Sequence, residues 1–372
     1  MKITKLSLVA ALLIGSSAMA LENTKVTGDA NLYYQTNVDA LADHAATTKG
    51  DASLNLNATT ELASTGGVTI TAGAGMTYIT TLGLENEVVG GVWAGSHDGL
   101  KDATWITEAY VAATTGNTTL KIGRQKLDTP LAYTETWNIE QNSFNAAVLI
   151  NTDLPGTTIV AANVYGSNGS GTGSVATDGD FSATNITVLG AINTSVEGLT
   201  AQAWYYSAGG NGVGNTTDTN LLWLQADAEI AGLTVGVQHS TSPDSSVSAI
   251  KVGGSVAGIA GSVAYSAVDA GGACGANAAT GNQSKLYTEA AWLFGNVTGA
   301  GASTMKVSAS VPTSYANLGF SATQVDAATE VNEYVATAST SFGIVNATLL
   351  YLNGNIGTTD VEVLQAYLST SF

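Results

Sequence analysis

The chain has 372 residues and a formal net charge of −18 at pH 7, an acidic balance that excludes electrostatic binding of nucleic acid. Charged residues make up only 11% of the chain, less than half of the share typical of soluble domains. With 43 Gly and only 4 Pro, the composition favours a sheet in which every backbone group is paired, as a bilayer requires.

Residues 1–20 have the pattern of a secretory signal peptide. Lys2 and Lys5 form a charged start, 6–15 form an apolar run, and Ala-Met-Ala at 18–20 supplies small residues for cleavage. The apolar run is too short to span a bilayer as a helix. We therefore expect cleavage before Leu21 and a single domain over 21–372. The alternative is an uncleaved membrane anchor.

The clearest alternation of apolar and polar residues lies in 53–62 and 68–78, on either side of a Thr-Gly-Gly turn. Leu54, Leu56 and Ala58 alternate with small polar residues, and Ile70 and Met76 continue the pattern after the turn. A helix is excluded because apolar residues two apart do not share a helical face. The two segments predict a β-hairpin with one apolar face and one small polar face, which suits a wet lumen.

The same unit recurs along the chain, with short turns and long Gly-, Ser-, Asn- and Asp-rich loops in alternation. About 18 strands are predicted, at 26–37, 53–62, 68–78, 102–114, 118–127, 143–151, 157–166, 183–193, 199–208, 219–230, 233–241, 247–256, 259–268, 285–295, 303–311, 330–341, 345–353 and 360–372. About 16 is an open alternative, because the pattern is weakest over 299–330. The fold class is all-β: a transmembrane antiparallel β-barrel with an even strand number, short periplasmic turns and longer extracellular loops.

The last predicted strand, 360–372, runs to the final residue. Leu364, Leu368 and Phe372 share one face, whereas Gln365 and Tyr367 share the other. In outer-membrane barrels the last strand pairs with the first, and a terminal aromatic belongs to the lower aromatic girdle. We therefore expect Phe372 to be an assembly signal read by the barrel-assembly machinery. Outer-membrane lipid and lipopolysaccharide are the partners expected around the barrel.

The segment 121–140 concentrates charge in a chain that has little. Its charged residues are Lys121, Arg124, Lys126, Asp128, Glu135 and Glu140. The stretch 127–143 also holds Pro130 and two aromatic residues, which fits a loop that folds into the barrel and narrows it. Carboxylates facing cations across a narrow lumen sort solutes by charge. We therefore assign these six residues to a pore constriction.

Strict alternation places only Lys121 inward on its strand, because Arg124 and Lys126 share the face of Leu120. A bulge at Gly123 would redirect the later side chains into the lumen. Otherwise the two cations reach lipid headgroups or a neighbouring subunit. Both readings are open at the level of sequence.

The stretch 120–131, L-K-I-G-R-Q-K-L-D-T-P-L, with the aromatic and polar sequence up to 144, resembles the segment before the constriction in OprD-like porins. It is most similar to the major outer-membrane porins of the epsilon class of proteobacteria. The resemblance implies a diffusion or modestly selective channel, a homotrimer, and a loop folded into the lumen. It also places Lys121, Gly123, Gln125, Thr129 and Pro130 in the constriction region. The chain departs from substrate-specific members, since it lacks the Arg and Lys residues of their basic ladder.

Other reactive residues are scattered. His44, His97 and His239 lie far apart, and the single Cys274 cannot form an internal disulfide. We expect neither an enzyme nor a cofactor. The acidic loop residues are read as a solvated face or, alternatively, as a site for a divalent cation that bridges to lipopolysaccharide. These are Asp39, Asp43, Glu85, Glu87 and Asp98.

The expected function is that of an outer-membrane porin, a water-filled channel for passive diffusion of small hydrophilic solutes and ions. The residues expected to line its lumen are Glu61, Glu108, Tyr110, Asp227 and Glu229. Their acidity indicates a mild preference for cations. The alternatives are a substrate-specific channel for a small organic ion and a non-conducting structural or adhesin barrel.

Overall fold

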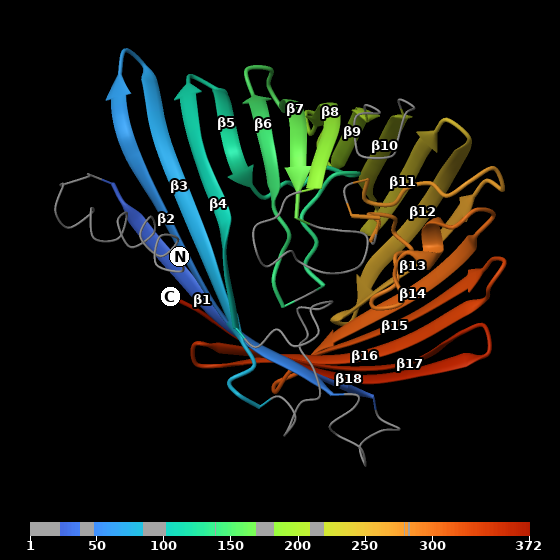
Figure 1. Cartoon of the computed structure of the whole chain (residues 1–372). Coiled ribbons are helices and arrows are strands. Elements are labelled where there is room, and N and C mark those ends of the chain that lie inside the picture. Colours follow the sequence, from blue (N-terminus) through green and yellow to red (C-terminus); the bar gives the residue numbers. More distant parts are fainter. Residues whose placement is uncertain are drawn as a thin grey trace.

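A computed structural model describes residues 23–37, 48–84, 102–137, 139–168, 182–208, 219–278, 280–281 and 283–372. The predicted signal peptide at 1–20 lies outside the described residues. The described strands form a single 18-stranded antiparallel sheet that closes on itself, because β1 pairs with β18 as well as with β2 (Figure 1). The predicted fold class is confirmed. None of the described residues belongs to a helix long and apolar enough to cross a membrane.

The strands differ in length, and the shortest ones flank the segment 126–143. They are β1 (Lys25–Asn37), β2 (Lys49–Thr65), β3 (Val68–Thr80), β4 (Asp102–Thr115), β5 (Thr118–Gln125), β6 (Phe144–Asn151), β7 (Thr157–Ser167), β8 (Ser182–Asn193), β9 (Leu199–Ala208), β10 (Thr219–Ile230), β11 (Leu233–Ser242), β12 (Ser245–Val256), β13 (Ile259–Val268), β14 (Ser303–Pro312), β15 (Asn317–Asp326), β16 (Val331–Phe342), β17 (Val345–Ile356) and β18 (Thr359–Ser371). Tight turns such as 66–67 and 116–117 join them at one end, and long connections such as 126–143 and 269–302 leave the other end.

Two segments depart from the prediction, although the number of strands is confirmed. The stretch 285–295 is no strand; it lies within the inserted connection 269–302, before the 3-10 turn η2 (Asn296–Thr298). β15 was not predicted, because the turn before it contains neither Gly nor Pro. There the Thr313 hydroxyl accepts hydrogen bonds from the backbone N–H groups of Tyr315 (3.2 Å) and Ala316 (3.0 Å).

The chain terminus closes the barrel. Gly28 N–H donates to the Phe372 carbonyl (2.8 Å), and Phe372 N–H donates back to the Gly28 carbonyl (2.9 Å). The Phe372 ring covers Gly28 on the outer face, where a Cβ on Gly28 would lie 2.6 Å from the ring. The terminal aromatic therefore packs in a space that only glycine leaves open.

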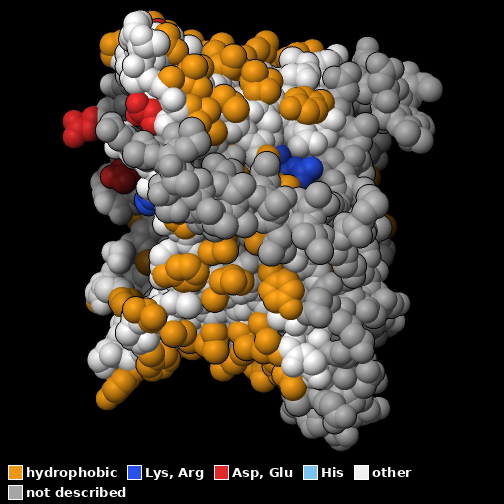
Figure 2. Space-filling model, turned by 60° about the vertical axis from the view of Figure 1, so that its left-hand side comes forward, with side chains coloured by type: hydrophobic (Ala, Val, Ile, Leu, Met, Phe, Trp, Pro, Cys, Tyr) orange, Lys and Arg blue, Asp and Glu red, His pale blue; other side chains and the backbone are white. Residues whose placement is uncertain are grey.

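The outer face is apolar along the strands. Near the long-connection end it carries half-exposed tyrosines on β3, β7, β9, β13 and β16: Tyr78, Tyr165, Tyr205, Tyr265 and Tyr334. Near the turn end it carries Phe320, Phe342 and Phe372, the last of them 64% exposed. Figure 2 shows one face of the molecule with many hydrophobic and few charged side chains. Two aromatic belts bounding an apolar band are the pattern of a barrel in a bilayer.

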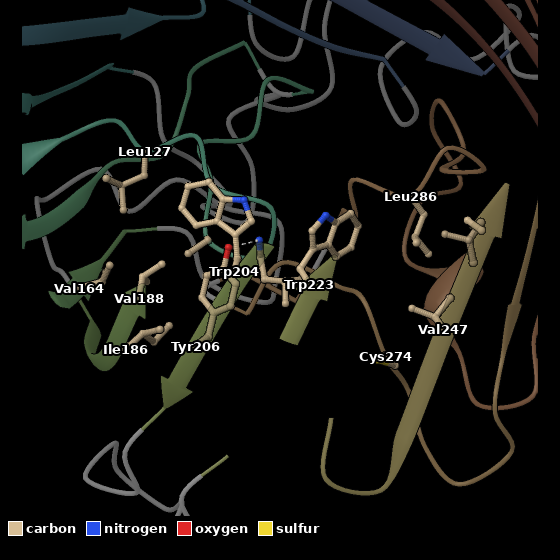
Figure 3. Packing of buried hydrophobic residues seen from close by; sticks show 14 of the residues in the cluster. Leu127, Val164, Ile186, Val188, Trp204, Tyr206, Trp223, Val247, Cys274 and Leu286 are labelled. Carbon is tan, nitrogen blue, oxygen red and sulfur yellow. Dashed lines mark hydrogen bonds between the residues drawn. The ribbon is translucent and has the colours of Figure 1, made fainter. Parts of the chain in front are cut away.

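The inner face is not uniformly small and polar. On β7 to β10 the inward side chains include Val164, Val188, Tyr206 and Trp223, all fully buried. They form a core with residues of the inserted connections, such as Leu127 (Figure 3). The prediction of a polar inner face therefore fails on this wall, because the connections cover it and exclude water.

Candidate functional site in the barrel lumen

The segment 126–143 crosses the interior of the barrel. At one end Asn55 of β2 donates a hydrogen bond from Nδ2 to Glu140 Oε1 (3.1 Å). At the other end the Leu131 N–H donates to the Tyr206 hydroxyl of β9 (3.1 Å). Because β2 and β9 lie on separate parts of the wall (Figure 1), the segment spans the lumen between them.

A second inserted segment, 269–302, meets the first at Glu135. This carboxylate accepts from Asn277 Nδ2 (3.1 Å), from the Gln283 N–H (3.1 Å) and from the Thr280 hydroxyl. Asn277 Nδ2 also donates to the Tyr133 carbonyl (2.9 Å). Glu135 is only 5% exposed. Glu135 is therefore buried where the two segments meet, and its assignment to the pore constriction stays a prediction.

Aromatic rings fill the centre of the junction. Trp137 of the first segment lies 6.3 Å from Trp292 and 5.0 Å from Phe294 of the second, measured between ring centroids. Trp292 and Phe294 lie 6.1 Å apart. Edge-to-face arrangements of this kind stabilise packing beyond the area they bury. The two segments thus share one apolar core within the lumen.

Glu333 of β16 fixes the backbone of the second segment. Its carboxylate accepts from the N–H groups of Ala291 (2.7 Å), Trp292 (2.8 Å) and Leu293 (2.6 Å). Gln238 of β11 likewise accepts from the Tyr287 N–H (3.0 Å). These side chains replace the strand partners that the alternation of 285–295 had predicted.

Three lysines of the lumen each lie over a tyrosine ring. The distances from Nζ to the ring centroid are 3.6 Å for Lys121 over Tyr110, 4.3 Å for Lys251 over Tyr287 and 4.8 Å for Lys285 over Tyr133. Lys251 Nζ is also 3.9 Å from Asp227 Oδ1, and Lys285 pairs with Asp128. Glu108 faces the lumen two residues from Tyr110 on β4. Each of these cations therefore has a carboxylate and a ring as neighbours.

Arg124 lies on the outer face, so its assignment to the constriction is wrong. The ladder between β4 and β5 continues without interruption through Gly123, and Arg124 pairs with Ala109 on the lipid side. Arg124 Nη1 donates to the carbonyl of Ile106 (2.6 Å), beside the bulge that displaces Thr107. No bulge at Gly123 redirects the side chain; β-strand alternation alone decides its direction.

The remaining predicted residues lie as follows. Register places Lys121, Glu61, Glu108, Tyr110, Asp227 and Glu229 on the inner face. Lys126 and Glu140 line a cavity of about 270 Å³ beside β1, β2 and β18. Asp128 lines a second cavity, of about 480 Å³, on the side of β8 to β11. Gly123 and Gln125 end β5, whereas Thr129 and Pro130 are buried in the crossing segment.

Several site residues were not predicted. Lys251, Lys285, Tyr287, Glu289 and Glu333 all contribute to the lumen or hold its inserted segments. The inward position of Lys251 could have been found, since it alternates with apolar residues of 247–256. Lys285, Tyr287 and Glu289 lie in 285–295 and Glu333 lies against it, and the sequence pattern wrongly predicts a strand for this stretch.

Two carboxyl groups of the inserted segments are held near neutrality. Burial raises the pKa of Glu140 to about 7, with the Asp29 carboxylate adding to the shift and hydrogen bonds from Ser53 and Asn55 opposing it. Burial likewise raises the pKa of Glu289 to about 7, against hydrogen bonds that include one from Ser284. Both groups therefore titrate in the physiological range.

No cluster of three or more His, Cys, Asp or Glu residues that could hold a metal ion occurs in the described part of the chain. The acidic loop residues proposed for a divalent cation lie in 38–47 and 85–101, outside the described residues. The same holds for His44 and His97. His239 lies on the outer face of β11, where Nδ1 is 2.9 Å from the Ser248 hydroxyl.

No protein-family model matches the chain, and no curated protein matches it. Solved structures share its fold. OccAB4 of Acinetobacter baumannii superposes with a TM-score of 0.77 at 11% identity, over 95% of this chain and 98% of that one. OccK8 (OprE) of Pseudomonas aeruginosa gives 0.75 at 13% identity, over 95% and 98%. The outer membrane protein OpdK of the same organism gives 0.71 at 12% identity, over 95% and 99%.

Proposed function

We propose that the chain is an outer-membrane porin, whose water-filled lumen passes small hydrophilic solutes and ions by passive diffusion. The observation that carries the proposal is the closed 18-stranded barrel with an apolar outer band and polar cavities beside its inserted segments. A barrel of this size encloses space for an aqueous channel. The shared fold with OpdK, described as an outer membrane protein, supports the location.

A mild preference for cations follows from the pairing of the lumen charges. Lys251 and Lys285 each lie within ion-pair distance of an aspartate, whereas Lys121 lies near Glu108 without an ion pair among the described residues. Among the described residues, Glu61 and Glu229 face the lumen with no lysine or arginine within ion-pair distance. Surplus carboxylates in a lumen attract cations and repel anions.

Planar-bilayer recording in a KCl gradient tests both parts of the proposal. We expect stepwise conductance and a reversal potential of cation-selective sign, which Glu229→Gln brings closer to zero. Glu362→Gln is the matched control, because Glu362 makes its hydrogen bond with Tyr351 on the outer face. Absence of conductance would overturn the porin, whereas an anion-selective potential would overturn only the cation preference.

The second candidate function is a substrate-specific channel for a small organic ion. The cavity of about 480 Å³ favours it, because the ion pair of Asp128 and Lys285 lies there beside Trp204 and Tyr287. Charges of both signs next to aromatic rings suit a charged solute with an apolar part. Liposome swelling over a panel of solutes separates the candidates: a porin passes all small solutes by size, and a specific channel passes one class faster.

A further inference from the structure

The cavity of about 270 Å³ where the crossing segment meets β1, β2 and β18 has a different chemistry from the larger cavity. The inner wall of β1, β2 and β18 forms one side of it, and the crossing segment forms the other with Thr136, Ile139, Glu140 and Gln141. Most of its lining side chains are amides, hydroxyls and carboxyls, with Lys126 as the one cation among the described lining residues. The proposed porin uses this cavity only as part of its polar lumen, and no ligand is assigned to it.

The wall of this cavity is a fixed network of amides. Asp29 Oδ2 accepts from Asn31 Nδ2 (2.7 Å) and from Asn55 Nδ2 (2.9 Å). Asn55 Nδ2 also donates to Glu140, and Tyr367 donates from its hydroxyl to Asn31 Oδ1 (2.9 Å). Side chains that hold one another in this way lose little entropy when a ligand binds. The wall is thus preorganised.

Two further amides enter the cavity from opposite sides. Asn57 projects from β2, and Gln141 projects from the crossing segment. Neither side-chain amide has a hydrogen-bond partner among the described residues. Each amide offers two N–H donors and one carbonyl acceptor. A solute between them needs groups that donate and accept at once.

An apolar edge completes the cavity. Ile139 and Tyr367 line it, and both pack with the cluster that includes Trp137 and Trp105. A solute with a C–H face as well as polar groups would therefore contact apolar and polar lining together.

We propose that this cavity is a binding site for an uncharged polyhydroxylated solute, a sugar or polyol, within the channel. Hydroxyl groups both donate and accept, which matches Asn57 and Gln141, whereas the carboxylates of Asp29 and Glu140 disfavour anions. Ammonium groups fit less well, because the carboxylate of Asp29 is already occupied by two amides and Lys126 adds a like charge. The inference rests on the proposed porin function for solute access.

Single-channel recording with glucose and maltose tests the site. We expect saturable blockade of the current by these sugars. Asn57→Leu and Gln141→Leu should each weaken the blockade about tenfold, the effect of one lost hydrogen-bonding group. Gln324→Leu is the matched control, because Gln324 is exposed on the outer face of β15, beside the outward-facing Met305. Quenching of tryptophan fluorescence by the same sugars, in folded protein in detergent, measures binding without conductance.

The outcomes are distinguishable. A protein that binds sugar in detergent but does not conduct keeps the site and overturns the porin. A conducting channel with neither saturable blockade nor quenching overturns the site alone. Blockade by choline or acetate in place of sugars overturns the solute class. An equal loss in Gln324→Leu, on the outer face, overturns the placement. Heat-modifiable migration on gels shows that each variant has folded.

Discussion

Single carboxylates hold the inserted segments in the lumen. Glu135 receives donors from 277–283, and Glu333 receives three consecutive backbone N–H groups of 291–293. A buried carboxylate that accepts hydrogen bonds from several N–H groups needs no cation beside it. The backbone N–H groups in turn have hydrogen-bond acceptors without a neighbouring strand. These residues determine the shape of the pore without facing it.

Glu333→Gln should loosen the second segment. The amide oxygen can still accept from the N–H groups of Trp292 and Leu293, but the amide NH2 group then faces the Ala291 N–H, donor against donor, at a cost of about 2 kcal/mol. We expect faster proteolysis within 285–295 and noisier open-channel current, with heat-modifiable barrel still formed. Glu330→Gln makes the same change on an exposed side chain that bonds Asn332, and it should leave both measurements unchanged. Wild-type proteolysis of Glu333→Gln would contradict the role.

Glu140 should make the channel sensitive to pH. Its pKa, raised to about 7, lies above the ordinary value, so the folded protein binds the proton more tightly than the unfolded chain does. The free energy of unfolding contributed by this group is therefore full below about pH 4.5 and falls as pH rises through 7. Ionisation adds a negative charge beside Asp29, and cation preference should grow.

Reversal potentials at pH 5.5 and 8 measure this growth. Glu140→Gln should remove much of the difference between the two values, because the amide does not titrate. Glu289 titrates in the same pH range, but its carboxyl group is buried and hydrogen-bonded to Ser284. An unchanged pH dependence in Glu140→Gln would show that other groups are responsible.

At the scale of elements, alternation predicts the strands and their faces but not their partners. The hairpin at 53–78 and the terminal strand follow the predicted faces, as the exposed Leu54 and Leu368 show. The stretch 285–295 alternates equally well, yet its hydrogen-bond partners are Gln238 and Glu333, far away in the sequence. Local pattern cannot reveal such partners. For the same reason the sequence did not predict the apolar inner face of β7 to β10, because the connections that cover this face are distant in sequence.

The two faces of β5 make a direct comparison possible. Lys121→Gln should free Glu108 of its cationic neighbour and shift the reversal potential further toward cation selectivity. Arg124→Gln should leave that potential unchanged, because Arg124 bonds to Ile106 outside the lumen. Bilayer recording of both variants in the same KCl gradient is the measurement. Equal shifts in the two variants would show that the faces are misassigned.

Closure depends on the contact between the first and last strands. Deletion of Phe372 removes two backbone hydrogen bonds and the ring that covers Gly28. Gly28→Val should have a similar effect, since its side chain occupies the place of the ring. We expect less heat-modifiable barrel in outer-membrane fractions for both variants. Ala30→Val, two residues along the same face, is the control; wild-type yields in the first two variants would contradict the role of this contact.

At the scale of the whole molecule, the barrel wall and the two inserted segments contribute different properties. The wall presents apolar side chains outward and closes through its termini, whereas the segments line two separate cavities of the lumen. Fold class and strand number could be predicted because they depend on local periodicity. The positions of the two cavities could not, because they depend on contacts between distant segments. The homotrimer expected from sequence stays a prediction, which chemical cross-linking in membranes can test.

The junction at Glu135 also has a consequence for the order of folding. Its hydrogen bond to Asn277 joins residues 142 positions apart, with eight strands between the two segments. Contacts across such a separation form only after the chain between them is arranged, because loop closure costs entropy in advance. The junction should therefore form only after β6 to β13 have been arranged.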